Sequence, residues 1–334
     1  MKQKFSRWLQ DAWYKEMYIS SELMPISMLY DDAMRFRLFL YKKGLLKKTK
    51  LAVPVLIVGN ITVGGTGKTP LIVWMARFLQ EEGYKPGIIS RGYGGHARQW
   101  PQWVDNNSDP ELVGDEAVLM AQRAACPIAV GPERVKAAQM ILDKSDCNII
   151  LSDDGLQHYA LERDIEIAVV DGERRFGNGY TLPCGPLREP IGRLKTVDLV
   201  IVNGVPDDCD ENEFCMAVEG DVLVNLVTKE EKLLSEFKGL SCHALAGIGN
   251  PKRFFNLLEK QQICIDTLAF QDHHQFKVED ISFNDDKPVL MTEKDAVKCL
   301  AFATDKHWYL PIKAKPEQPF IDKLLTLIKE KTRG

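Results

Sequence analysis

The sequence predicts an α/β protein whose main part is a parallel β-sheet with helices on both faces. Short apolar runs of strand length recur through the middle of the chain, and stretches that read as helices separate several of them. Most of the runs end in a polar or glycine-containing turn. Apolar runs with almost no polar alternation are typical of parallel strands that are buried on both faces.

Length and charge suggest that the molecule has several parts. The chain has 334 residues, which corresponds to about two domains. Its net charge is −4, but residues 1–50 carry 11 Lys and Arg against five acids, so this segment is +6 and the remainder is −10. A basic arm on an acidic body indicates a local anionic partner and argues against general nucleic-acid binding.

The N-terminal residues and the cysteines indicate in which compartment the protein works. We expect no secretory signal, because the first ten residues lack an apolar core, and no membrane span, because no uninterrupted apolar run reaches about 18 residues. The eight cysteines are scattered and form no CxxC pair. We therefore expect buried thiols in a reducing compartment rather than disulfides or a zinc site.

The N-terminal arm, residues 1–50, predicts two helices at 3–24 and 27–46. Trp8, Leu9 and Trp13 mark one apolar face of the first helix, and Lys and Arg flank both helices. Tryptophan and tyrosine beside basic residues suit the headgroup region of a bilayer, which predicts a membrane-association segment. The alternative is an arm packed on its own domain. The second helix fits that alternative better, because its apolar residues cover more than one face.

The next part, residues 51–220, carries the alternation of strands and helices. Strands are predicted at 53–59, 86–90, 128–130, 148–152, 165–170 and 197–203, with helices at 69–82, 114–125 and 133–143. A polar, acidic stretch at 205–221 is the predicted boundary. Beyond it the alternation restarts, with strands at 243–248, 288–291 and 308–311 and helices at 252–261 and 320–331. Residues 221–334 therefore predict a second, smaller α/β domain that contributes to the active site.

A glycine-rich turn after the first strand predicts a phosphate-binding P-loop. The stretch GNITVGGTGKTP at 59–70 follows an apolar run and opens a helix, which is the context that a P-loop requires. Its glycines let backbone N–H groups turn toward phosphate oxygens, and the helix N-terminus adds positive potential. The usual pattern has glycine where Thr62 stands, but the core resembles the GGxGKT variant. The predicted nucleotide-binding residues are Thr62, Gly64, Gly65, Thr66, Gly67, Lys68 and Thr69.

Two acids after a buried strand predict a Mg²⁺ site. Asp153 and Asp154 follow the apolar run at 148–152, and the carboxyl end of a parallel strand lies beside the P-loop. In P-loop enzymes such an aspartate and the loop threonine, here Thr69, hold the metal. Which aspartate lies nearer the metal stays open.

A kinase also needs a group that accepts the proton of the acceptor hydroxyl, usually a carboxylate. Asp115 opens the predicted helix at 114–125, where it could instead be an ordinary N-cap. Asp272, His273 and His274 form a second cluster in the smaller domain. This cluster could orient an imidazole, or it could be an ordinary surface group.

Two loops rich in arginine follow predicted strands and should lie at the same edge of the sheet. Arginine there can clamp phosphate groups of nucleotide or acceptor, although structural salt bridges are the alternative. The candidate substrate-binding residues are Arg91, Arg174, Asn178 and Arg188.

Together, these stretches resemble the tetraacyldisaccharide 4'-kinase family over nearly the whole chain. The strings are VGNITVGGTGKTP, SRGYGG, GDE, SDDGLQH, DGERRFGNGYTLPCGPLREP, the DHH cluster and MTEKDAVK, in this order. The P-loop is common to many NTPases, but the RFGNG…GPLREP stretch and the last two elements are specific. Cys184 stands where the family commonly has alanine.

The resemblance implies ATP-dependent phosphorylation of the 4'-hydroxyl of a tetraacylated glucosamine disaccharide 1-phosphate, giving lipid IVA. It implies ATP and Mg²⁺ as cofactors and a peripheral enzyme at the cytoplasmic face of a Gram-negative inner membrane, with no nucleic acid and no obligate protein partner. By motif, Lys68 and Thr69 match the P-loop pair and Asp153 and Asp154 the acidic metal-side motif. Asp115 and His273 match the catalytic dyad of the family.

Two other functions fit parts of the sequence. The first is a membrane-associated ATPase switch without a lipid acceptor, but such switches carry a lysine where this chain has Val63. The second is a soluble small-molecule kinase whose N-terminal helices pack on the fold.

Overall fold

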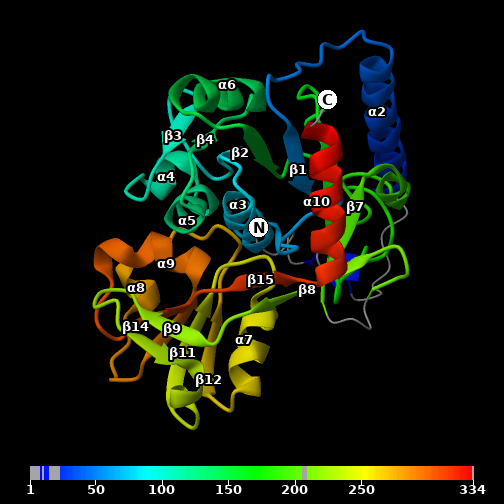
Figure 1. Cartoon of the computed structure of the whole chain (residues 1–334). Helices are drawn as coiled ribbons and strands as arrows, with labels where there is room; N and C mark the ends of the chain where they lie inside the picture. Colours follow the sequence, from blue (N-terminus) through cyan, green and yellow to red (C-terminus); the bar gives the residue numbers. More distant parts are fainter. Residues whose placement is uncertain (1–7, 10, 15–22, 205–208, 333–334) are drawn as a thin grey trace.

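Two β-sheets organise the chain, and the chain crosses between them twice (Figure 1). The computed structural model describes residues 8–9, 11–14, 23–204 and 209–332. In Figure 1 the smaller sheet, with α7 and α9, lies below the larger one, and the red C-terminal helix α10 runs alongside the larger one.

The larger sheet has the order β15-β8-β7-β6-β1-β5-β2-β4-β3 in the described part of the chain. The strands from β8 to β4 are parallel, whereas β15 and β3 pair antiparallel at the two edges. The bounds are β1 Val55–Gly59, β2 Pro86–Ser90, β3 Gln102–Val104, β4 Ile128–Val130, β5 Ile149–Asp153, β6 Ile165–Asp171, β7 Leu199–Asn203, β8 Phe214–Glu219 and β15 Lys313–Pro316.

Helices cover both faces of this sheet, as the sequence predicts. On one face α3 (Lys68–Glu81), α5 (Asp115–Ala124) and α10 (Gln318–Thr332) pack on the strands. Helix α3 does so through apolar residues at helical spacing, including Leu71, Met75 and Leu79. On the other face lie α6 (Arg134–Lys144) and the loops that follow β5 and β6. Two short elements, α4 (Pro110–Val113) and η2 (Ile191–Thr196), complete this part.

The smaller sheet has the order β10-β9-β14-β13-β11-β12. Its strands are β9 Val222–Asn225, β10 Glu231–Leu233, β11 Ser241–Ala246, β12 Cys264–Ala269, β13 Val289–Thr292 and β14 His307–Leu310. Helix α7 (Pro251–Lys260) packs on one face, and α8 (Val278–Ile281) and α9 (Glu293–Cys299) pack on the other. Two short 3-10 helices are η4 (Leu234–Phe237) and η5 (Leu300–Phe302).

The end of the chain returns to the larger sheet. The sequence analysis assigned 221–334 as a whole to the smaller domain, whereas β15 pairs with β8 and α10 buries Phe320, Leu324 and Ile328 in the larger core. The stretch 205–221, treated as a boundary, contains β8. Both crossings lie together, because a Cβ on Gly220 would stand 2.8 Å from the carbonyl oxygen of Pro311.

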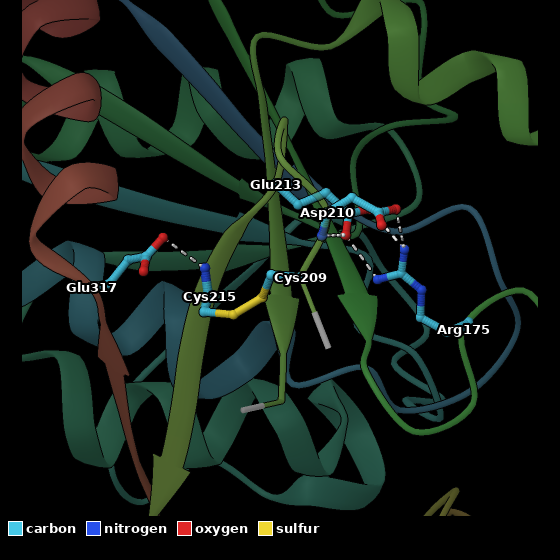
Figure 2. Close-up of a disulfide and its surroundings, with 6 residues drawn as sticks. All are labelled: Arg175, Cys209, Asp210, Glu213, Cys215 and Glu317. Carbon is cyan, nitrogen blue, oxygen red and sulfur yellow. Dashed lines mark hydrogen bonds and ion pairs between the residues drawn. A yellow bond between two sulfur atoms is a disulfide. The ribbon is translucent and has the colours of Figure 1, made fainter. Parts of the chain in front are cut away.

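One disulfide corrects the expectation for the cysteines. Cys209 and Cys215 are linked (Figure 2), so the prediction of thiols without disulfides is wrong for this pair. The turn at residues 209–213 brings the two Cα atoms to 6.1 Å, a separation that a disulfide can span. Arg175 holds this turn through Glu213 and Asp210. The other six cysteines are free, and Cys264 is exposed rather than buried.

The N-terminal arm leaves apolar side chains in solvent. Helix α2 (Met24–Lys42) touches the larger domain through Ser27 and Tyr30, which bond Thr181 and the carbonyl oxygen of Arg188. The sequence analysis favoured packing for this helix, but a set of its large apolar residues is exposed: Ile26, Met28, Leu29, Phe36 and Phe39. Much of the first predicted helix lies outside the described residues. Among the residues that are described, no helix is long and apolar enough to span a bilayer.

Candidate active site

The glycine-rich loop between β1 and α3 has the backbone shape of a phosphate cradle. Gly64 and Gly67 have φ angles of 110° and 92°, which side chains other than hydrogen rarely allow. A Cβ on Gly67 would stand 2.4 Å from Nδ2 of Asn203, and that amide donates to the carbonyl oxygen of Thr66 at 3.1 Å. Asn203, the last residue of β7, therefore holds the glycine-rich loop in place.

The loop lines a cavity of about 520 Å³ between the two sheets. Of the predicted nucleotide-binding residues, Gly64, Gly65, Thr66, Gly67, Lys68 and Thr69 all line it. Thr62 is buried beneath the loop and pairs with Leu187 of the GPLREP stretch. This backbone pairing explains how the specific late motif supports the P-loop.

Asp153 ends β5, and Asp154 follows it with a φ angle of 48°. Ser90, at the end of β2, donates to one Asp153 oxygen at 3.0 Å. Asp154 lies 3.5 Å from Nζ of Lys68 and 2.8 and 2.9 Å from Nη1 of Arg188. The two carboxylates thus meet different partners at the P-loop edge.

These surroundings move the two pKa values apart. Burial, with help from the charges of Glu116 and Asp154, raises the pKa of Asp153 to about 7. Burial also raises the pKa of Asp154, but the cations Lys68 and Arg188 outweigh it and hold that pKa well below its usual range. Asp154 is therefore the permanent anion of the pair.

The donor set beside the P-loop fits Mg²⁺. Within the described residues, Oδ1 of Asp153 is buried and has no hydrogen-bond partner. No group of three or more His, Cys, Asp and Glu side chains in the described ranges forms a closed metal cage. Mg²⁺ commonly takes one or two carboxylates together with phosphate oxygens and water, so Thr69, Asp153 and Asp154 suit it.

A second set of groups assembles from both domains. His273, in the loop after β12, places Nδ1 3.1 Å from each carboxylate oxygen of Asp115 on α5. Gly114, not Asp115, is the N-cap of α5, so Asp115 is not an ordinary cap. His274 instead bonds Asp280 at 3.0 Å and stacks on Phe270. The histidine that meets Asp115 is therefore His273.

Both members of this pair have shifted pKa values. Burial raises the pKa of Asp115, but the hydrogen bond from His273 and the charges of Lys294 and Lys298 prevail and lower it to about 2. Burial lowers the pKa of His273, while its bond to Asp115 reverses the direction and raises it overall. Asp115 is consequently ionised at neutral pH.

The predicted substrate-binding residues are placed differently from one another. Arg91, Arg174 and Arg188 line the cavity, and Arg174 donates to the carbonyl oxygen of Gly249 at 2.9 Å. Asn178 does not belong to the cavity lining, because its side chain donates to the carbonyl oxygen of Cys184 within its own loop.

Several groups at the site were not selected from the sequence. Lys294 bonds Glu116 and Asp272, and Arg123 binds Glu293 across the domains at 2.6 and 2.7 Å. Both α9 residues belong to the MTEKDAVK stretch, which was noted as a motif without roles for its residues.

Comparisons with known proteins relate the chain to one family. The model of one protein family, described as LpxK, tetraacyldisaccharide-1-P 4'-kinase, matches residues 19–329. A tetraacyldisaccharide 4'-kinase from Nitrosococcus oceani is 51% identical over 95% of this chain and 93% of its own length. One from Methylobacillus flagellatus is 48% identical over 97% of each chain. The crystal structure of LpxK from Aquifex aeolicus in complex with ATP matches with a TM-score of 0.80 and 29% identity, over 93% of this chain and 99% of that one.

Proposed function

The chain belongs to the tetraacyldisaccharide-1-phosphate 4'-kinase family, and from this premise we propose how its residues carry out the reaction. The protein is a kinase of lipid A biosynthesis that uses ATP to phosphorylate the 4'-hydroxyl of tetraacyldisaccharide 1-phosphate. This activity excludes the two alternative functions considered from the sequence, the ATPase switch without an acceptor and the soluble small-molecule kinase.

One observation carries the assignment of roles. The P-loop, the Asp153–Asp154 pair and His273 all line a single cavity of about 520 Å³. Nucleotide phosphates on Gly64–Thr69 would thus lie in the same space as His273, the hydrogen-bond partner of Asp115. Holding both reactants in one cavity lowers the barrier through orientation, which is the main contribution that a phosphoryl-transfer enzyme makes.

Lys68 and the helix N-terminus neutralise phosphate charge. Lys68 opens α3 and keeps its ammonium near Asp154, 3.5 Å away, so that it is positioned at the cradle before nucleotide binds. Arg91, Arg174 and Arg188 add positive charge around the cavity and would bind phosphate oxygens of nucleotide or acceptor. Asn178 supports the loop that carries Arg174 and remains a weaker candidate for substrate contact.

Thr69, Asp153 and Asp154 are the residues that would hold Mg²⁺. The unpartnered oxygen of Asp153 supports this assignment. An ion held by these residues would supply positive charge against the phosphates of the nucleotide.

Asp115 accepts the proton of the 4'-hydroxyl, and His273 orients its carboxylate. The two hydrogen-bond distances of 3.1 Å and the low pKa of Asp115 support an ionised carboxylate held in a fixed direction. A carboxylate of low basicity suits a loose transition state, in which the hydroxyl proton leaves late.

The enzyme works as a peripheral protein at the cytoplasmic face of the inner membrane, where its lipid substrate lies. The exposed apolar side chains of α2, among them Met28, Leu29 and Phe36, would enter the bilayer interface. The net charge of +6 on residues 1–50 would attract anionic headgroups.

The activity is tested by transfer of labelled γ-phosphate from ATP to tetraacyldisaccharide 1-phosphate in detergent micelles. Label should appear in the lipid and be lost in Lys68→Ala. ATP hydrolysis that ignores the acceptor, with no labelled lipid, would overturn the assignment.

The membrane role is tested by sedimentation with vesicles containing anionic lipid. Replacing Met28, Leu29 and Phe36 together by serine should weaken binding, whereas the matched control Val278→Ser with Leu300→Ser, exposed on the smaller domain, should not. Equal sedimentation of both variants and the wild type would remove α2 from this role.

A further inference from the structure

Helix α9 of the smaller domain lies against the catalytic pair. Its residue Lys294 is mostly shielded, with 14% of its side chain exposed, and its ammonium contacts groups from both domains. It donates to Glu116 of α5 at 2.9 Å and to Asp272 at 3.0 Å. The same Nζ atom lies 3.3 Å from Nε2 of His273.

These contacts determine where the imidazole proton lies. An ammonium group has donors only, so Nε2 of His273 must accept when it bonds Lys294. The ring proton of neutral His273 then lies on Nδ1, where it donates to Asp115. With both ring nitrogens engaged, His273 has no lone pair left for a proton from the substrate, whereas the Asp115 carboxylate has further lone pairs.

We propose that Lys294 is a positioning residue that holds His273 in the Nδ1–H tautomer and thereby leaves proton acceptance to Asp115. Because Lys294 also bridges Glu116 and Asp272, this arrangement forms only when the two domains meet. The inference rests on the proposed function of the Asp115–His273 pair, which it deepens.

The charges around His273 agree with this role. Asp115 and Glu116 come from α5, Lys294 and Lys298 from α9, and Asp272 precedes the histidine; in addition, the Tyr93 ring packs on the imidazole at 4.7 Å. Burial and the charge of Lys294 lower the pKa of His273, against the rise that Asp115 produces. Loss of Lys294 should therefore raise this pKa and free Nε2.

The experiment uses ¹⁵N-histidine NMR on the full-length protein, which contains six histidines, with His273→Asn to assign the signal. In the wild type we expect the Nδ1–H tautomer. In Lys294→Met we expect a higher pKa of His273 and therefore more imidazolium with a proton on Nε2, because the opposing ammonium charge is gone. Lys294→Arg keeps this charge and should bring the pKa back toward that of the wild type. The matched control is Lys287→Met, an ion-paired lysine on the surface of the smaller domain.

Kinetics give the second readout. Lys294→Met should lower kcat by roughly 10- to 100-fold, with little change in KM for ATP, and move the acid limb of the pH profile upward. An unchanged tautomer and pKa in Lys294→Met would overturn the inference, even if activity fell. Because the NMR signal needs no turnover, this outcome is distinct from failure of the kinase assignment.

Discussion

The phosphate cradle and the catalytic pair are built in different ways. The cradle, residues 64–69 with Asp153 and Asp154, comes entirely from the larger domain and from loops that directly follow β1 and β5. The pair joins Asp115 of the larger domain to His273 of the smaller one, 158 positions along the chain. In the proposed mechanism, the phosphate cradle therefore belongs to one domain, whereas the group that accepts the proton is completed by both.

The proposed roles assign nucleotide binding and proton transfer to different parts of the molecule. Contacts that cross the domains lie at the catalytic pair, where Lys294 meets Glu116 and Lys298 meets Asp115, and also beside the P-loop, where Arg174 meets Gly249. Changes at Lys294 and Lys298 should therefore reduce kcat more than nucleotide affinity.

The largest expected effect comes from breaking the pair itself. Asp115→Asn should lower kcat by ~10²–10⁴-fold, because a neutral amide accepts no proton, with a modest change in KM for ATP. Steady-state phosphate transfer measures this. Because the pair acts as a unit, Asp115→Asn with His273→Asn should be little worse than either alone. A kcat near that of the wild type would remove Asp115 from its role.

Breaking the cradle should give the next largest effect. Lys68→Ala should lower kcat/KM for ATP by roughly 10²–10³-fold, because the ammonium no longer neutralises phosphate charge. The ¹⁵N signal of His273 should stay the same, since the pair does not depend on the cradle. A displaced His273 signal would contradict the separation of the two regions.

A substitution where the two domains meet should lower kcat by a smaller factor. A Cβ on Gly249 of the smaller domain would stand 2.9 Å from the backbone nitrogen of Gly65 in the P-loop. Gly249→Ala should thus hinder the approach of the domains and lower kcat by about 10- to 100-fold. Equilibrium binding of an ATP analogue should weaken less than kcat falls. The control is Gly239→Ala, which also lies in the smaller domain but has no neighbour within 4 Å. Because its φ is 77°, Gly239→Ala carries a backbone strain that Gly249→Ala does not, so a larger loss of kcat in Gly249→Ala than in this control reports the contact with Gly65.

The smallest effect concerns stability rather than turnover. The pKa of Asp115 is lowered from 3.8 to about 2, so its ionisation stabilises the folded state above pH 3.8 and this stability is lost as the pH falls toward 2. The contribution at neutral pH is about 2 kcal/mol. Urea unfolding of the wild type and Asp115→Asn should therefore differ more at pH 6 than at pH 3. A difference that is independent of pH would contradict the shift.

The sequence predicts those strands that carry a strong local pattern and misses those that do not. Strands β2 and β4 have the predicted bounds, because all their residues are buried and their apolar runs are uninterrupted. Strand β12 was missed because it lies at an edge and exposes much of its length. Strand β15, with the sequence KAKP, carries almost no apolar signal.

The site divides similarly. The P-loop and the Asp153–Asp154 pair are short contiguous patterns, so their chemistry could be inferred locally. Asp115 and the cluster with His273 were noted as candidates from their residue types, but only the family resemblance paired them, since nothing in residue spacing reports that two distant segments meet. Lys294 belongs to a motif that was noted, but nothing local reports its contacts, because its partners come from two other segments of the chain.

The paired crossings between the sheets limit how the smaller domain moves. Gly220 and Pro311 touch, and Glu219 pairs with Lys313 directly beside them. Two adjacent connections act as a hinge, and they restrict the orientation of the smaller domain more than a single flexible linker would. We therefore expect any opening to be a rotation about these two connections, which would carry Gly249, His273 and Lys294 away from the larger domain together.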